Sequence, residues 1–512
     1  MATKSVIIIG AGVAGLSAGC YAQMNGFRSQ LFELHTIPGG LCTSWRRHGY
    51  LFDGGVRYLS GANPRAKAYP MWQELGALPE QGLYHYDEFI CVEDNRGRAF
   101  HLYTNLDRLK EEMWRLSPGD YDAITVLIDA LRALATFDLP LDPTPDDARE
   151  NLQMGLAMLP FIGPLLRWKD VTLGDFVTRF RDPLLRRGLM EFLQFARPDF
   201  PLLMLLITLA QMSNKMAAYP IGGSLDLAER IARRYRDLGG QIQYEARVIK
   251  ILVKHDCAVG VQLADGTEHY ADMVISAADG RSTIFDLLGG HYVDEHIHDY
   301  YGTMPLAPSI IQVALGVDRD FTAEPPALCF PLSHPLDCGD LRHDHLTVRH
   351  YAFDPTLAPA GKTVLNLWCA ADYGYWKGLY TMPSAYNAAK ERVEQQVIGA
   401  LNGRYPGLAA QVEASDVATP VTYERYTANW RGSIYGWAMA PRKMTLMMGQ
   451  GMRKTLPGLQ NFYMIGQWVE PGGNVQLSAA SGRDLIETLC QSAGQPFITT
   501  LPIAMNKINK ER

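Results

Sequence analysis

Residues 6–33 read VIIIGAGVAGLSAGCYAQMNGFRSQLFE, and this stretch decides the fold. Val6–Ile9 predicts a central parallel strand, because its branched side chains are apolar on both faces. Of the glycines that follow, Gly10 allows a tight turn and Gly12 lets the backbone approach a pyrophosphate. Gly15 lets the next helix pack closely against the strand. The spacing of these glycines predicts a dinucleotide site.

The residues that flank the glycines complete this site. The helix that begins there, with Ala14 in its first turn, presents free N–H groups and a positive dipole end to the phosphates. A second strand at 29–32 places Glu33 where its carboxylate can accept hydrogen bonds from ribose hydroxyls. Residues 5–27 carry no charge, which would also fit a secretory or membrane segment, but five glycines, Gln23 and Asn25 disfavour it.

The composition is that of a globular protein with room for more than one domain. The chain has 512 residues, 47% hydrophobic and 20% charged, and its net charge is −6. This charge, without any basic run, argues against nucleic-acid binding. The eight cysteines form no C-x-x-C pair, which favours reduced thiols in a cytoplasmic enzyme over a disulfide framework. No uninterrupted apolar run is long enough to span a bilayer.

Further glycine-rich segments suit the binding of a long cofactor. PGG at 38–40 follows the second strand, and FDGG at 52–55 comes shortly after it. Residues 219–253 place a glycine pair before an amphipathic helix and a further strand. Residues 461–490 contain a strand, a PGG turn and a helix that opens at Asn474. Each paired glycine permits another close approach between backbone and ligand.

In this order, these segments resemble the flavin-dependent amine oxidase superfamily. Within it, the chain resembles the bacterial phytoene desaturase branch, together with the carotenoid isomerases and retinol saturases. The resemblance implies an α/β fold, in which a discontinuous Rossmann-like domain binds FAD and an inserted α+β domain holds the substrate. It also implies the residues that contact FAD: Gly10, Gly12, Ala14, Gly15, Glu33, Gly39, Gly40, Leu41, Gly55, Val248, Gly466, Gln467, Gly473, Asn474 and Val475.

The chain departs from the family pattern at three positions. Leu41 stands where many relatives have Arg, Gln467 replaces an acid or small residue near the ribitol, and Asn474 replaces a glycine beside the flavin ring. These differences leave the site in place but set the chain apart from the characterised desaturases. The substrates of the characterised desaturases therefore cannot be assigned directly to this chain.

The physical chemistry of the closing motif can be interpreted without the family. A helix that begins near Asn474 and Val475 points its N–H groups and positive dipole end outward. Facing the flavin N1–C2=O edge, these groups would stabilise the negative charge of the reduced ring. We expect the Gly473 loop to border the cofactor alone, so that a side chain there would move only the helix start.

Two long insertions between the flavin segments predict a second domain. We expect the FAD-binding domain to comprise residues 1–105, 219–300 and 455–495, the substrate domain residues 106–218 and 301–454, and a tail residues 496–512.

The composition of the two insertions leaves several structures open. The first is strongly apolar at 152–168 and 200–212, which fits core helices, a substrate tunnel or contact with a membrane surface. The second is dense in aromatic residues at 371–380 and 423–437, which fits core packing or a cage for the substrate.

Few charged residues come close to the expected flavin. Arg57 and Tyr58, just beyond the FDGG step, are catalytic candidates, because the guanidinium could pair a substrate carboxylate or stabilise reduced flavin. Glu470 is a candidate acid or base beside the closing turn. Three histidines at 343–350 have no accompanying carboxylate or thiol cluster, so we predict no metal site.

Together these features predict an FAD-dependent oxidoreductase that transfers hydride between flavin N5 and carbon of an apolar, polyene or isoprenoid-like substrate. Desaturation, saturation and isomerisation stay open. The main alternative is an amine or amino-acid oxidase, and a second is a prenyl-binding escort protein, which would not need intact flavin loops. The expected partner is a hydrophobic small molecule, in the cytoplasm, with peripheral membrane contact as an open alternative.

Overall fold

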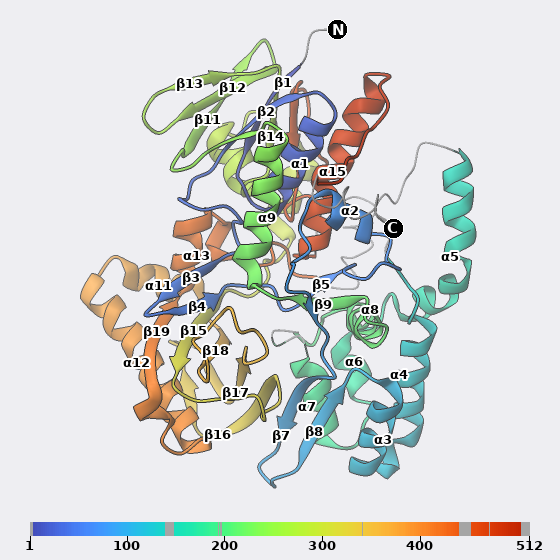
Figure 1. Cartoon of the computed structure of the whole chain (residues 1–512), viewed down its shortest axis with the longest axis vertical. Helices are drawn as coiled ribbons and strands as arrows, with labels where there is room; N and C mark the ends of the chain where they lie inside the picture. The colour runs from blue at the N-terminus through green and yellow to red at the C-terminus, as the bar shows by residue number, and fades with distance from the viewer. Residues whose placement is uncertain are drawn as a thin grey trace.

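The computed structural model describes residues 4–138, 148–192, 194, 197–339, 341–439, 452–470 and 472–502. Helices cover a parallel sheet in one half of the molecule and a larger mixed sheet in the other (Figure 1). The predicted α/β class, with a Rossmann-like domain, is confirmed.

The parallel sheet is built around the strand that the sequence places at its centre. Its order is β10-β2-β1-β14-β20. Val6 and Ile8 of β1 pack in a cluster that also holds residues of four helices, whereas Ile7 and Ile9 pack on the opposite face. β1 is thus buried on both faces, as its composition predicts. The elements are β1 (Ser5–Ile9), β2 (Arg28–Phe32), β10 (Gln241–Gln243), β14 (Met273–Ser276), β20 (Phe462–Met464), α1 (Val13–Met24), α9 (Gly223–Asp237) and α15 (Val475–Ser492).

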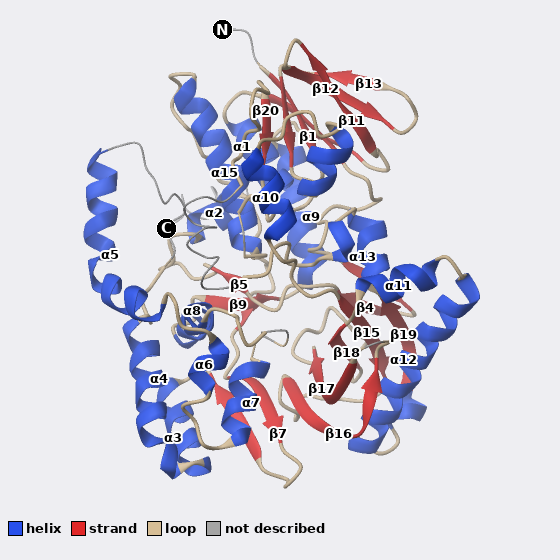
Figure 2. Ribbon diagram, turned by 180° about the vertical axis from the view of Figure 1, so that it is seen from behind, coloured by secondary structure: helices blue, strands red, loops and turns tan. Residues whose placement is uncertain are grey.

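A small antiparallel sheet and a helix complete the other side of this unit (Figure 2). Ile251 and Val261 of the small sheet share a buried cluster with Ile7 and Ile9. The elements are β11 (Val248–Lys254), β12 (Cys257–Leu263), β13 (Glu268–Tyr270) and α10 (Glu295–Thr303).

The second sheet has seven strands in the order β19-β15-β18-β17-β16-β7-β8. On one face, Ile311 and Leu367 pack against Val397 and Leu401 of α12. The elements are β7 (Glu88–Glu93), β8 (Ala99–Tyr103), β15 (Ile310–Val317), β16 (Ala327–Asp337), β17 (Arg342–His350), β18 (Thr363–Ala370), β19 (Val412–Ala418), α11 (Tyr373–Tyr380), α12 (Pro383–Arg404) and α13 (Pro420–Thr427).

The sheet pairing differs from the predicted boundary at residue 105. β7 and β8 lie inside the segment expected to bind FAD, yet β7 pairs with β16 in the seven-stranded sheet. The reason is a long-range strand pairing, which joins Cys91 to Leu328 and leaves no local signal in the sequence. The pairing thus places β7 and β8 in the same sheet as strands of the second insertion, and the domain boundaries stay a prediction.

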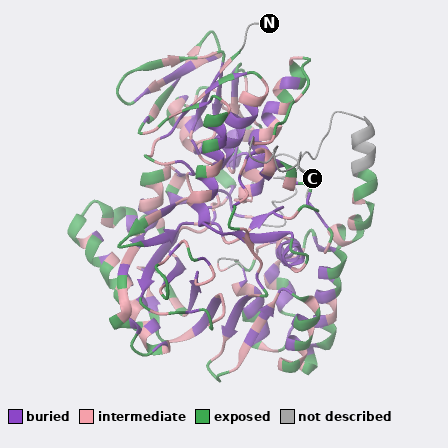
Figure 3. Cartoon of the chain, in the orientation of Figure 1, coloured by how far each residue is buried: buried purple, intermediate pink, exposed green. Residues whose placement is uncertain are grey.

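The two apolar stretches of the first insertion have opposite surroundings (Figure 3). α8 is buried along nearly its whole length, with Leu205 and Leu206 in the core. α5 instead has an exposed face, which includes Leu159 and Leu166. The helices are α3 (Leu106–Leu116), α4 (Tyr121–Ala133), α5 (Ala148–Trp168), α6 (Leu173–Val177), α7 (Pro183–Glu191) and α8 (Leu202–Ser213).

Short elements connect the two halves. β9 pairs with both β5 and β6, and β3 pairs with β4. They are β3 (Ser44–Arg47), β4 (Tyr50–Asp53), β5 (Leu59–Ser60), β6 (Leu83–Tyr84), β9 (Ala217–Pro220) and α2 (Tyr69–Glu74). In the part of the chain that the structure describes, no helix combines the length and hydropathy needed to cross a bilayer.

Candidate functional site

A cavity of about 440 Å³ lies where β1 and β14 end and α1 and α15 begin. This is the edge of a parallel sheet at which dinucleotides bind. All but one of the predicted cofactor residues line the cavity, and the exception, Gly15, lies behind it. The structure thus brings together segments that lie more than 400 residues apart in the sequence.

The glycines have distinct surroundings. A Cβ at Gly15 would lie 2.0 Å from the carbonyl oxygen of Gly10, so close packing of α1 requires glycine there. A Cβ at Gly12 would meet only the Gly39 carbonyl oxygen, at 3.9 Å. Gly39 in turn donates its N–H to the Ala11 carbonyl oxygen at 2.8 Å. The PGG loop is therefore held against the first glycine turn, and the open space at Gly12 belongs to the cavity.

Glu33 is buried at the end of β2 and lines the cavity. Its Oε2 accepts from the Ala11 N–H at 2.6 Å, and its Oε1 accepts from the His35 N–H at 2.8 Å. Burial raises the pKa of the carboxyl, and these backbone N–H groups oppose that rise. The fixed carboxylate keeps acceptor capacity for the hydroxyls of a ribose.

The start of α15 forms the other end of the cavity. Asn474 caps the helix, because its side-chain oxygen accepts from the Gln476 N–H at 2.7 Å. Asn474 and Val475 both line the cavity, so the first N–H groups of the helix lie at its wall. The expectation for Gly473 is wrong: a Cβ there would lie 2.6–2.9 Å from Tyr435, including its Cα. The loop packs against protein as well as bordering the cavity.

The other departures from the family pattern also have defined surroundings. Leu41 lines the cavity and packs with Ile310, Trp368 and Ile434 in a small apolar cluster. Its side chain therefore completes an apolar wall and supplies no charge to a phosphate. Gln467 lines the cavity near Gly436.

The three catalytic candidates do not line this cavity. Arg57 is half-buried and lies over Trp368, which lines the cavity, with its guanidinium carbon 4.2 Å from the centre of that ring. Tyr58 packs edge-on against Phe89, with ring centres 6.4 Å apart. Glu470 forms an ion pair with Lys454 at 3.2 Å and is 39% exposed, which suits a surface ion pair. Their catalytic roles stay predictions.

Among the cavity residues that were not predicted to contact the cofactor, Asp279, Trp368 and Tyr435 have side chains that matter for the site. Asp279 follows β14, where it accepts from the Ser282 and Trp430 N–H groups at 2.7 and 2.8 Å. Burial raises its pKa to about 6. Trp368 and Tyr435 line the cavity from the second insertion. Only the position of Asp279 directly after a predicted strand could have indicated it.

A second cavity of about 470 Å³ adjoins the first and shares Gly40, Leu41, Gly54 and Thr427 with it. Tyr423 and Tyr426, from the aromatic insertion, line this second cavity. Neither cavity is lined by any described residue of 106–218, so the tunnel expected there stays a prediction.

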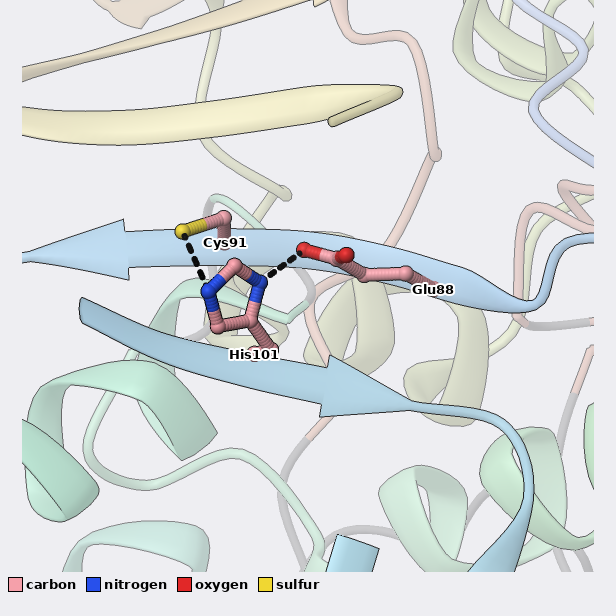
Figure 4. A group of neighbouring side chains, drawn as sticks. All are labelled: Glu88, Cys91 and His101. Atoms are coloured by element: carbon pink, nitrogen blue, oxygen red, sulfur yellow. Dashed lines mark hydrogen bonds and ion pairs between the residues drawn. The ribbon is translucent and has the colours of Figure 1, made fainter. Parts of the chain in front are cut away.

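One group of described residues has the proximity that a metal ion requires, and it lies apart from both cavities. Figure 4 shows Glu88 and Cys91 of β7 around His101 of β8. His101 Nδ1 is 2.9 Å from Glu88 Oε1, and its Nε2 is 4.0 Å from Cys91 Sγ. Burial raises the pKa of the Cys91 thiol, and a thiol is a poor metal ligand compared with a thiolate. We assign no metal to this group.

Comparisons with known proteins agree with this geometry. A family model described as an NAD(P)-binding Rossmann-like domain matches residues 8–75. The chain is 26% identical over 507 residues to prolycopene isomerase of Arabidopsis thaliana, which covers 93% of this chain and 81% of the relative. It is 24% identical over 515 residues to phytoene desaturase (neurosporene-forming) of Rhodobacter capsulatus, which covers 96% and 94%. A solved putrescine oxidase variant superposes with a TM-score of 0.64 at 14% identity, covering 96% of this chain and 99% of that one.

The fold and the cavity define a dinucleotide-binding flavoenzyme, and the chain is an oxidoreductase. The near full-length matches confirm the predicted resemblance to the flavin-dependent amine oxidase superfamily, and within it to the phytoene desaturase-like branch.

Proposed function

We propose that the protein binds FAD and acts on carbon–carbon bonds of an apolar polyene, as a desaturase, saturase or isomerase. The observation that carries this proposal is the single cavity that runs from Glu33 to the start of α15, in a chain similar to carotenoid enzymes over more than nine-tenths of its length. Bound FAD would supply hydride acceptance and donation at its N5 atom.

Each part of FAD has suitable residues along this cavity. Val248 borders the adenine end, and Glu33 would accept from the ribose hydroxyls. Gly12 and the start of α1 would take the pyrophosphate, because the N–H groups there are free and the helix dipole favours negative charge. Gln467 and Val475 border the flavin end. A ligand without the flavin half would leave the α15 end of the cavity unused.

The amine oxidase alternative has weaker support. The solved structures of putrescine oxidase and cyclohexylamine oxidase that superpose on this chain are 13–14% identical to it, so they support the fold and not the substrate. Lys377, a candidate for the lysine that amine oxidases use, forms a 2.5 Å ion pair with Glu424 instead of lining the cavity. The escort-protein alternative is disfavoured because the flavin loops form an intact cavity.

A substrate survey on the flavin-loaded protein tests this function. We expect phytoene, lycopene isomers or retinol to bleach the flavin anaerobically, or to change geometry when the flavin is reduced beforehand. Putrescine, benzylamine and L-phenylalanine should do neither. Flavin absorbance and chromatography of the polyenes measure both reactions. Rapid bleaching by an amine with release of hydrogen peroxide, and no response to polyenes, would favour the oxidase instead.

We also propose that α5 rests on an anionic membrane surface. Leu156, Leu159, Ile162 and Leu166 are spaced along one face of the helix and are 43–61% exposed. The opposite face is anchored, because Phe161 packs against Phe137 with ring centres 5.2 Å apart. The helix thus has two apolar faces, and only one of them packs against the rest of the protein.

The charge at the end of α5 favours an anionic bilayer as the partner. Exposed Arg167 and Arg179 lie over the ring of Trp168, at 4.8 and 5.8 Å from its centre. Such an arrangement, apolar side chains beside basic ones, is typical of helices that lie in the membrane interface. Binding of α5 to a bilayer would place the protein at the membrane, in which apolar polyenes dissolve.

Sedimentation with phosphatidylglycerol–phosphatidylcholine vesicles tests this contact. The double variant Leu159→Glu and Ile162→Glu should bind about a hundredfold more weakly, because two buried aliphatic side chains contribute about 3 kcal/mol. The matched control is Met382→Glu with Ile498→Glu, two exposed apolar side chains elsewhere, which should bind like the wild type. Equal binding of both double variants would rule out α5 as the contact.

A further inference from the structure

The two faces of the seven-stranded sheet differ sharply in composition. On the face towards α12, the paired residues are large aliphatics, such as Val313 opposite Leu367. On the other face, Gln312 pairs with Trp368, and Asn366 pairs with Arg349. This second face is the one from which Trp368 reaches the dinucleotide cavity. Gln312 and Asn366 each donate a side-chain N–H to the Asp53 carbonyl oxygen at 2.8 Å, so these two polar residues help to hold the fold together.

Arg349 is the most unusual residue on this face. It is only 4% exposed, and its Nε and Nη1 are buried without a hydrogen-bond partner among the described residues. Its guanidinium carbon lies 4.7 Å from the centre of the Phe89 ring and 5.9 Å from that of Tyr86. No ion pair to Arg349 is present in the described part of the chain. A buried cation with unmade hydrogen bonds destabilises the folded protein, and a ligand of opposite charge would offset this effect.

Arg349 has a second cation, the half-buried Arg57, as a neighbour. The Tyr86 hydroxyl, beside Arg349, donates to the Arg57 carbonyl oxygen at 3.1 Å. Burial lowers the pKa of Arg57. Tyr435 raises this pKa, whereas the charge of Arg349 lowers it further. Arg57 in turn lies over Trp368, whose ring borders the dinucleotide cavity. Two arginines thus lie together in an apolar region, next to the expected flavin.

We propose that the apolar substrate ends in a carboxylate, and that this carboxylate forms an ion pair with Arg349, next to Arg57. This inference rests on the proposed function and narrows its substrate class. A pure hydrocarbon offers no acceptor to a guanidinium, whereas a carboxylate supplies both the negative charge and the acceptor oxygens. The aromatic rings of Tyr86 and Phe89 would then contact the apolar chain next to the carboxylate.

Binding of a matched pair of probes to the flavin-loaded protein tests the proposal. All-trans-retinoic acid and retinol share their polyene and differ in the end group. We expect the wild type to bind the acid at least about tenfold more tightly, as measured by quenching of tryptophan fluorescence. Arg349→Met should lose at least about thirtyfold in affinity for the acid and little for the alcohol, and Arg349→Lys should restore part of the preference. Arg115→Met, at an exposed surface arginine, is the control and should bind like the wild type.

The unfolding temperature of each variant shows whether a loss of binding results from a loss of fold. Arg349→Met should unfold at the same or a higher temperature without ligand, because it removes an uncompensated buried charge. Equal affinity for acid and alcohol in the wild type, an unchanged preference in Arg349→Met, or a large fall in its Tm would overturn the inference and leave the proposed function standing. Failure to bind any polyene, charged or neutral, would overturn both.

Discussion

Gly12→Val is expected to give a folded but colourless protein, whereas the wild type is yellow and releases FAD, not FMN, on denaturation. The valine side chain fits the protein itself, because the nearest protein atom to a Cβ at Gly12 is 3.9 Å away. It would instead occupy the space that the pyrophosphate needs. Such a clash costs about 3 kcal/mol or more, which weakens binding at least about a hundredfold. Absorbance at the flavin band and chromatography of the released cofactor measure the effect.

Substitutions at two other glycines distinguish a loss of the cofactor from a loss of the fold. Gly399 in α12 has nothing within 4 Å of a Cβ, so Gly399→Val should keep both fold and FAD. Gly15→Ala places its Cβ 2.0 Å from the Gly10 carbonyl oxygen, so it should lower the Tm as well as the FAD content. A colourless wild type that FAD cannot reconstitute would contradict the assignment of the cavity. So would a Gly12→Val protein that retains FAD.

The dinucleotide half could be predicted because its determinants are local. A β-branched run, three glycines at fixed spacing and an acid after the second strand each have a steric or electrostatic reason that acts over a few residues. β1, α1 and Glu33 accordingly lie where these rules place them. The opening of α15 at Val475 follows from the same kind of local evidence, a PGG turn and a capping asparagine.

The features that could not be predicted depend on contacts between distant segments. α5 and α8 have similar apolar compositions, yet α8 is buried while α5 has an exposed face, because only tertiary neighbours decide which helix is covered. The contact of Gly473 with Tyr435 joins two loops that are distant in the sequence and share no motif. Arg349 shows no local signal in the sequence, and only its burial between Phe89 and Tyr86 identifies it. The substrate side of the site therefore required the structure.

The largest effect on reaction rate is expected from Val475→Pro. Val475 is the first residue of α15 and lines the cavity, and the N–H of a first helical residue has no partner within its helix. Proline is favoured at this position, and Asn474, at φ −102° and ψ 135°, has a conformation that is allowed before proline. The substitution therefore removes one backbone donor and leaves the helix start in place. A larger side chain at Gly473 would also clash with Tyr435, so Val475→Pro tests the role of the helix N–H more directly.

If the start of α15 stabilises negative charge at the flavin N1–C2=O edge, Val475→Pro should keep FAD but lower its reduction potential. Its flavin should be reduced about a hundredfold more slowly, because loss of one preorganised donor costs about 3 kcal/mol in the transition state. Val475→Ala keeps the N–H and is the matched control, which should retain the wild-type potential. An unchanged potential and rate in Val475→Pro would mean that α15 serves only to close the cavity. Arg57, which lies over the Trp368 ring, would then be the better source of the positive charge that stabilises reduced flavin.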